Sequence, residues 1–108
     1  MRFFAFNDGF VKPFKIKNAD GTPKDLIGLT VQWYFVDRDG NSPAGSPVPG
    51  VITDAAAGQV RFTIPEGMFT KKTRYICQLN LSSEGYDEDT KAFTVDIDNP
   101  RLRDNVEN

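Results

Sequence analysis

The fold is decided by the stretch Leu29-Thr30-Val31-Gln32-Trp33-Tyr34-Phe35-Val36. Its odd-numbered positions are apolar and alternate with Thr30, Gln32 and Tyr34, a period of two that places one set on a single face of a sheet. The stretch is rich in β-branched and aromatic residues and contains the only tryptophan of the chain, a composition that fits a pleated, half-buried surface. Gly28 precedes it and the turn residues 37–41 follow it. The sequence therefore predicts a central strand with Trp33 in the core.

Three later segments repeat this alternation. Residues 59–64, 75–81 and 91–97 carry apolar side chains at every second position, as half-buried strands do. The predicted inward set is Val60, Phe62, Ile64, Tyr75, Cys77, Leu79, Leu81, Phe93, Val95 and Ile97. Ile76 is an apolar exception on an otherwise polar face. Turn signals recur about every ten residues and no internal segment has a convincing helical period, so the sequence predicts an all-β, antiparallel β-sandwich of about seven short strands.

The remaining segments are less regular. Pro13 cannot donate a ladder hydrogen bond, so we expect the strand within 10–17 to lie at an edge or to be bulged. The Pro- and Gly-rich residues 41–50 are predicted to hold no regular structure. We expect an irregular helical turn over 66–72 and a polar hairpin loop over 83–89.

The length of 108 residues suits one domain with one core. We assign residues 1–98 to the sandwich and residues 99–108 to a tail, which is either a short helix or a linker. The net charge is −2, and without a strongly basic face no nucleic-acid partner is expected. The first residues contain too short an apolar run for a signal peptide or a membrane span, so we expect synthesis in the cytoplasm and no membrane partner.

The residue inventory disfavours an enzyme. The sequence has no histidine, which removes Ser/His and Cys/His nucleophile–base pairs and the commonest metal ligand. The single cysteine, Cys77, cannot form an intramolecular disulfide, and its inward phase predicts a small buried apolar side chain rather than a nucleophile. One cysteine without histidine cannot make a closed zinc site. We therefore expect no catalytic residue, no cofactor-binding residue and no resident metal.

Two acidic segments are candidate calcium ligands. Residues 37–41 resemble the start of a calcium loop but lack the closing glutamate that the twelve-residue loop requires. An Asp-Gly turn explains the same residues without a ligand. Residues 87–89 are acidic, and we expect them to be solvated at a loop tip, with weak calcium binding as the alternative.

The two ends of the chain carry a candidate interface. Four phenylalanines in the first ten residues exceed what one short strand can bury, and such apolar surface usually meets a partner. The alternative is that these rings cap one open end of the sandwich. In the tail, two apolar residues lie four apart, on one face of a predicted helix that is too short to fold alone. The candidate interface residues are Phe3, Phe4, Phe6, Phe10, Leu102 and Val106.

The order of these motifs resembles that of a known family. The central motif is Gly58-Gln59-Val60-Arg61-Phe62-Thr63-Ile64-Pro65. The other matching runs are residues 20–28, 29–35, 50–54, 75–79 and 90–95. Together they resemble the N-terminal immunoglobulin-like domain of the phage baseplate upper protein (BppU) family. The resemblance covers residues 10–97.

This resemblance implies an immunoglobulin-like sandwich and a non-enzymatic structural protein of a phage or prophage baseplate or tail. It implies contacts with other tail or baseplate proteins, homo-oligomerisation in the assembled particle, and a place in the virion. The family offers no catalytic residues to carry over. The alternative is a carbohydrate-binding β-sandwich, which would need an exposed aromatic platform of Trp33, Tyr34, Tyr75 and Tyr86. Trp33 shares its predicted face with apolar neighbours, which argues against that platform.

Overall fold

The computed structural model describes residues 2–3, 10–65, 67–69 and 72–97. These residues form eight strands and contain no helix. The strands are β1 (Arg2–Phe3), β2 (Phe10–Lys15), β3 (Thr30–Val36), β4 (Val48–Asp54), β5 (Gln59–Ile64), β6 (Thr73–Ser83), β7 (Tyr86–Asp89) and β8 (Phe93–Ile97). The described part of the chain includes no helix long and apolar enough to cross a membrane.

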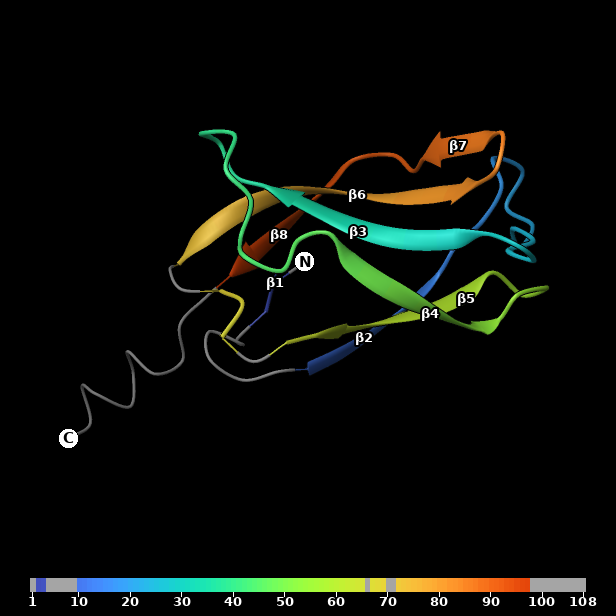
Figure 1. Cartoon of the computed structure of the whole chain (residues 1–108), viewed down its shortest axis with the longest axis horizontal. Coiled ribbons are helices and arrows are strands. Elements are labelled where there is room, and N and C mark those ends of the chain that lie inside the picture. Colours follow the sequence, from blue (N-terminus) through green and yellow to red (C-terminus); the bar gives the residue numbers. More distant parts are fainter. Residues whose placement is uncertain (1, 4–9, 66, 70–71, 98–108) are drawn as a thin grey trace.

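The strands form two layers (Figure 1). One layer has the order β1-β8-β6-β3, with β7 also paired to β6, and the other has the order β4-β5-β2. Strand β4 connects them, because Val48 and Pro49 pair with β3 whereas the residues from Gly50 onward pair with β5. All pairs are antiparallel except β1 with β8. The predicted all-β, antiparallel sandwich is confirmed.

The pairing order is that of an immunoglobulin-type sandwich. Strands β3, β6 and β8 form one layer in the way that strands C, F and G do, and β4, β5 and β2 correspond to D, E and B. Trp33 on β3 then occupies the place of the buried tryptophan on strand C. The count is eight strands rather than about seven because the region after the β6 turn pairs as a strand of its own.

The core lies between the layers and is built around Trp33. Its side chain is fully buried, with a relative exposure of 0%. The indole stacks on Phe35 with a centroid distance of 4.6 Å and meets the rings of Phe14 and Phe62 edge to face at 5.0 and 5.3 Å. All predicted inward residues are buried except Phe93, which is half-buried against the core. The predicted central strand is therefore confirmed.

Pro13 lies in β2, which ends the strand order of its layer. The edge position predicted from the missing N–H is confirmed. Residues 48–50, in contrast, were predicted to be loop and belong to β4. Pro49 is tolerated there because it lies where β4 leaves β3 and begins to pair with β5. The next residue must be small, because a Cβ on Gly50 would lie 2.8 Å from side-chain atoms of both Val60 and Phe62.

Three further predictions were wrong in part. The hairpin loop is shorter than 83–89, because Ser83 pairs with Tyr86 across the two-residue turn Glu84-Gly85. The last strand begins at Phe93 rather than Lys91. Of the helical turn predicted over 66–72, residues 67–69 and 72 are not helical, and residues 66, 70 and 71 lie outside the described residues.

Candidate protein–protein interface

An apolar strip lies on the outward side of β3 and β6. Val36 pairs in register with Ile76, and Tyr34 lies two residues back along β3 on the same face. These side chains keep 38%, 52% and 40% of their surface exposed. A single exposed apolar residue is ordinary, but three that adjoin form a surface suited to contact with another protein.

A shallow pocket of about 380 Å³ adjoins this strip and is lined by Tyr34, Val36, Gln78, Asn80 and Asp89. At its rim, the side-chain amide of Asn80 donates hydrogen bonds to the carboxylates of Asp87 (2.6 Å) and Asp89 (2.8 Å). The amide thereby holds the two carboxylates side by side on the outward side of β7. Within the described residues, neither carboxylate forms an ion pair.

The other end of this side of the layer is electrically balanced. The guanidinium of Arg74 donates from Nε and Nη2 to the two carboxylate oxygens of Asp96, at 2.6 and 3.2 Å. These bonds raise the pKa of Arg74, since they favour its charged form. The unbalanced charge on the outward side of β3, β6, β7 and β8 is therefore that of Asp87 and Asp89. We call the outward residues Tyr34, Val36, Ile76, Gln78, Asn80, Asp87 and Asp89 the acidic face.

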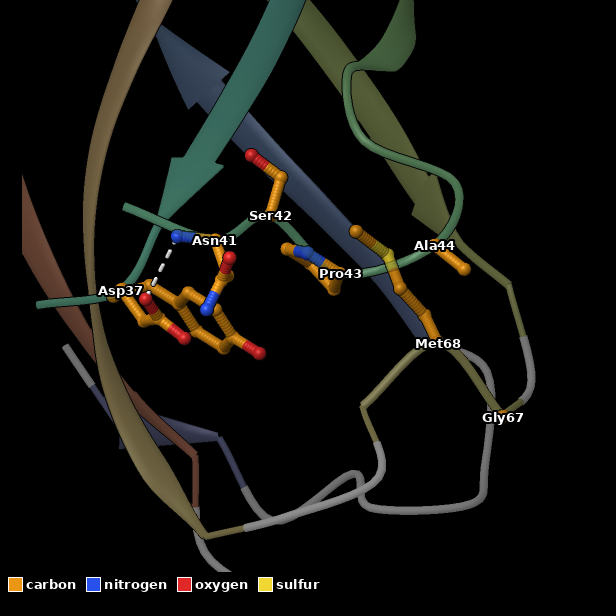
Figure 2. A pocket seen from close by; sticks show the side chains of 8 residues that line it. Asp37, Asn41, Ser42, Pro43, Ala44, Gly67 and Met68 are labelled. Carbon is orange, nitrogen blue, oxygen red and sulfur yellow. Dashed lines mark hydrogen bonds between the residues drawn. The ribbon is translucent and has the colours of Figure 1, made fainter. Parts of the chain in front are cut away.

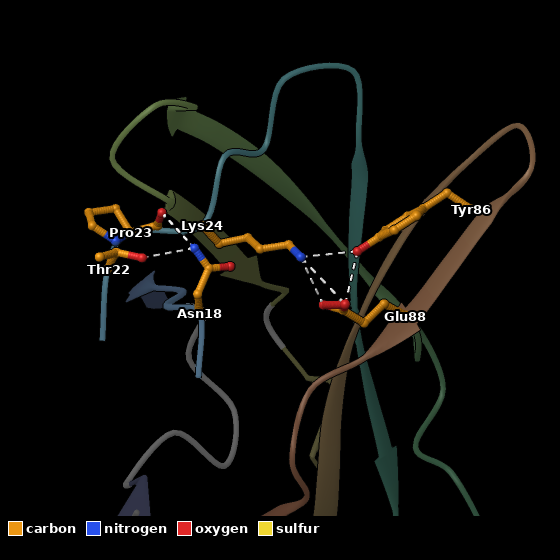
Figure 3. A network of polar contacts seen from close by, with 6 residues as sticks. All are labelled: Asn18, Thr22, Pro23, Lys24, Tyr86 and Glu88. Carbon is orange, nitrogen blue, oxygen red and sulfur yellow. Dashed lines mark hydrogen bonds and ion pairs between the residues drawn. The ribbon is translucent and has the colours of Figure 1, made fainter. Parts of the chain in front are cut away.

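Glu88 points to the other side of β7, into a polar network (Figure 3). Lys24 Nζ donates to the Tyr86 hydroxyl at 3.1 Å and lies 3.2 Å from Glu88 Oε1, while the Tyr86 hydroxyl donates to Glu88 Oε2 at 2.9 Å. Hydrogen bonds from Tyr86 first, and then from Lys24, lower the pKa of Glu88. The hydrogen bond to Tyr86 and the contact with Glu88 raise the pKa of Lys24. The network therefore links Lys24, in the loop that precedes β3, to Tyr86 and Glu88 in β7.

Residues 87–89 therefore do not point toward one common site, because Glu88 faces away from its two acidic neighbours. They also lie in a paired strand rather than at a solvated loop tip. The described residues include no group of three or more Cys, Asp or Glu side chains that could hold a metal ion.

The other acidic segment forms a turn beside a pocket of about 300 Å³ (Figure 2). Asp37 is buried, and its Oδ1 accepts hydrogen bonds from the backbone N–H groups of Asp39 and Asn41, both at 2.9 Å. The Gly40 N–H donates to the Asp37 carbonyl at 3.0 Å, and Gly40 has a positive φ of 84°. The Asp-Gly turn predicted from the sequence is confirmed, and the Asp37 carboxylate is engaged by its own loop. Met68 and Tyr75 also line this pocket.

Cys77 is buried at the centre of β6, as its phase predicted. Burial raises the pKa of its thiol to about 11, and the neighbouring Trp33 side chain acts in the opposite direction. The thiol is therefore protonated at neutral pH. Trp33 and Tyr75 are both buried, so they cannot contribute to the exposed aromatic platform that carbohydrate binding would require.

The structure places the predicted interface residues only in part. Phe3 lies in β1 at the edge of one layer, and Phe10 begins β2 at the edge of the other. Phe4, Phe6, Leu102 and Val106 lie outside the described residues. The sequence prediction missed the strip of Tyr34, Val36 and Ile76. The sequence contains one signal for this strip, the apolar Ile76 on an otherwise polar strand face. The β3–β6 register is needed to place Val36 beside it.

The fold thus places the protein among immunoglobulin-type β-sandwiches with an exposed apolar and acidic side. Residues 13–108 match the family described as the BppU N-terminal domain. The chain belongs to this family, which is a family of structural proteins related to the phage baseplate. The resemblance seen in the sequence motifs is confirmed. A comparison with curated proteins gives no match.

Proposed function

We propose that the protein is a non-enzymatic structural component of a phage or prophage baseplate or tail that acts through contacts with neighbouring proteins. The observation that carries the proposal is the family match over residues 13–108. The acidic face supports it, because exposed apolar side chains around a shallow pocket suit a protein partner. The protein is made in the bacterial host cytoplasm and becomes part of the virion.

The two ends of the chain supply further contacts. The apolar density of the first ten residues and the four-residue spacing in the tail support this role. A segment too short to fold alone gains order when it docks on a neighbour. The proposed contact residues are Phe3, Phe4, Phe6, Phe10, Leu102 and Val106.

The proposal is tested on particles of the phage or prophage that encodes the protein. Mass spectrometry of purified particles should detect the chain, and immunogold labelling should place it at the baseplate or tail. Removal of residues 99–108, or the double substitution F4S/F6S, should reduce incorporation. Ile27→Ser is the matched control, because Ile27 is a highly exposed apolar side chain outside the proposed contacts. Particles that lack the wild-type chain would contradict the proposal.

A further inference from the structure

We infer that the acidic face of one copy packs against the outward face of β2 and β5 of a second copy, so that copies associate head to tail. The inference rests on the proposed function, because it names a second copy of this chain as one of the protein partners. It is carried by the match between the two faces in charge and in the spacing of charged and apolar residues.

The outward side of β2 and β5 is apolar and cationic. Val11, Pro13 and Lys15 alternate outward along β2, and Arg61 on β5 pairs with Pro13 on one side and with Val51 on the other. Val11 and Val51 keep more than half of their surface exposed. We call the exposed residues Val11, Pro13, Lys15, Lys17, Val51 and Arg61 the basic face.

Among the described residues, the acidic side chain beside the basic face is that of Asp54, the last residue of β4. Its Oδ1 accepts a hydrogen bond from the backbone N–H of Ala57 at 3.2 Å. It pairs with Gln59, one row beyond Arg61 on the outward side of β5. The cations Lys15, Lys17 and Arg61 therefore outnumber it, and the basic face is opposite in charge to the acidic face.

The spacing along the acidic face is set by β6. Asn80 and Ser82 lie four and six residues after Ile76 on the same side of that strand, and they pair with Asp89 and Asp87 respectively. At about 3.3 Å per residue, the backbone positions of Asp89 and Asp87 stand roughly 13 and 20 Å from Ile76, measured along the strand, and the Asn80 amide holds their two carboxylates together.

The basic face repeats this spacing. Lys15 and Lys17 lie four and six residues after Val11, and both are exposed while Ile16 between them is buried. Lys15, the last residue of β2, therefore stands at about the same 13 Å from Val11, and Lys17 lies two residues further on, in a bridge with Pro23. When Val11 of one copy is placed on the apolar strip of another, with the strands aligned, Lys15 meets Asp89 and Lys17 meets Asp87.

The two faces belong to opposite layers of the sandwich, so one copy can use both at once (Figure 1). Packed sheets keep their strand directions within about 30° of each other, which this alignment needs. Because each contact joins two different faces, the association is heterologous and continues as a ring or a stack. Two acidic faces could not meet in the same way, since like charges would oppose each other.

Sedimentation equilibrium of the full chain tests the inference with a charge exchange. The wild type should increase in mass with protein concentration, and high salt should reverse this because it screens exposed charges. Lys15→Glu and Asp89→Lys should each remain monomeric. An equimolar mixture of K15E and D89K should associate again, because each contact in an alternating assembly then joins opposite charges. The double variant K15E/D89K should also associate.

Matched charge reversals outside the two faces, Arg38→Glu and Glu84→Lys, should associate like the wild type. Thermal unfolding of every variant should show that each is folded. A wild type that stays monomeric, or a mixture of K15E and D89K that fails to associate, would overturn the inference. These outcomes are distinguishable from failure of the proposed function, because that function is judged by whether the wild-type chain is present in particles.

Discussion

Substitution of Gly58 should destabilise the protein more than substitution of any open-turn glycine. Gly58 is buried at the end of the β4–β5 turn and has a φ of +70°. A Cβ at this position would clash with the backbone carbonyl oxygen of Ile16. It would also lie 3.0 Å from the backbone carbonyl oxygen of Lys24. Both obstacles are backbone atoms, so no side-chain rotation can make room.

The cost has two parts. An alanine in the left-handed region costs about 1–2 kcal/mol, and a more restricted unfolded chain returns about 0.4–1 kcal/mol of this. Relief of the clash moves residue 58 away from residue 16, which loses the hydrogen bond from the Ile16 N–H to the Gly58 carbonyl (2.8 Å) and strains that from the Lys24 N–H to the Ile16 carbonyl (3.0 Å). Each such bond contributes about 0.5–1.5 kcal/mol. Gly58→Ala should therefore lower the free energy of unfolding by about 3 kcal/mol, and with it the Tm by roughly 12–20 °C.

Gly28→Ala separates the two parts. Gly28 has a similar φ of +76°, but a Cβ there would meet no atom within 4 Å. This variant should lose only about 1 kcal/mol, from the backbone strain alone. Thermal and urea unfolding followed by circular dichroism measure both variants. Equal losses in Gly58→Ala and Gly28→Ala would refute the argument that the backbone contact with residue 16 decides the cost.

The remaining predictions concern the core and the polar network. Trp33 emission should be blue-shifted in the native state, and Trp33→Ala should cost about 3–5 kcal/mol in an unfolding titration. A thiol reagent at pH 8 should modify Cys77 rapidly only after denaturant is added, because the native thiol is buried with a raised pKa; fast modification of the native protein would contradict this. The lowered pKa of Glu88 means that its contribution is complete above the ordinary value of 4.5 and is lost as the pH falls below it. The Tm difference between the wild type and Glu88→Gln should accordingly shrink in acid, and a difference that grows would be the wrong sign.

The core was predictable because it depends on local alternation. The period of two in β3, β5, β6 and β8 fixes which side chains point inward, whatever the strands pair with. Met68 and Phe69 are also buried, although they follow no such period and lie outside the strands. Phe69 packs against the rings of Phe35 and Tyr75, which lie on two other strands, so its burial is a property of the tertiary structure.

The path of β4 could not be predicted from the sequence for a similar reason. Residues 48–50 contain proline and glycine, and both types are rare inside strands. They are accommodated because β4 changes partners at this point and because the missing Cβ of Gly50 leaves room for Val60 and Phe62. Neither reason can be read from residues 48–50 alone, since each depends on a strand that is distant in the sequence.

The acidic face also depends on the pairing of strands that are distant in the sequence, and this pairing is what makes it an argument for a contact surface. Val36 and Ile76 are each unremarkable at an outward strand position, because β-branched residues favour strands. The other outward residues of β6 are Arg74, Gln78, Asn80 and Ser82, all of them polar. The pairing of Val36 with Ile76 therefore brings together apolar side chains from two strands that are forty residues apart in sequence, whereas the polar positions around them remain polar. Strand propensity explains each residue singly but does not explain their placement beside two carboxylates that form no ion pair within the described residues. Contact with an apolar and cationic surface explains both.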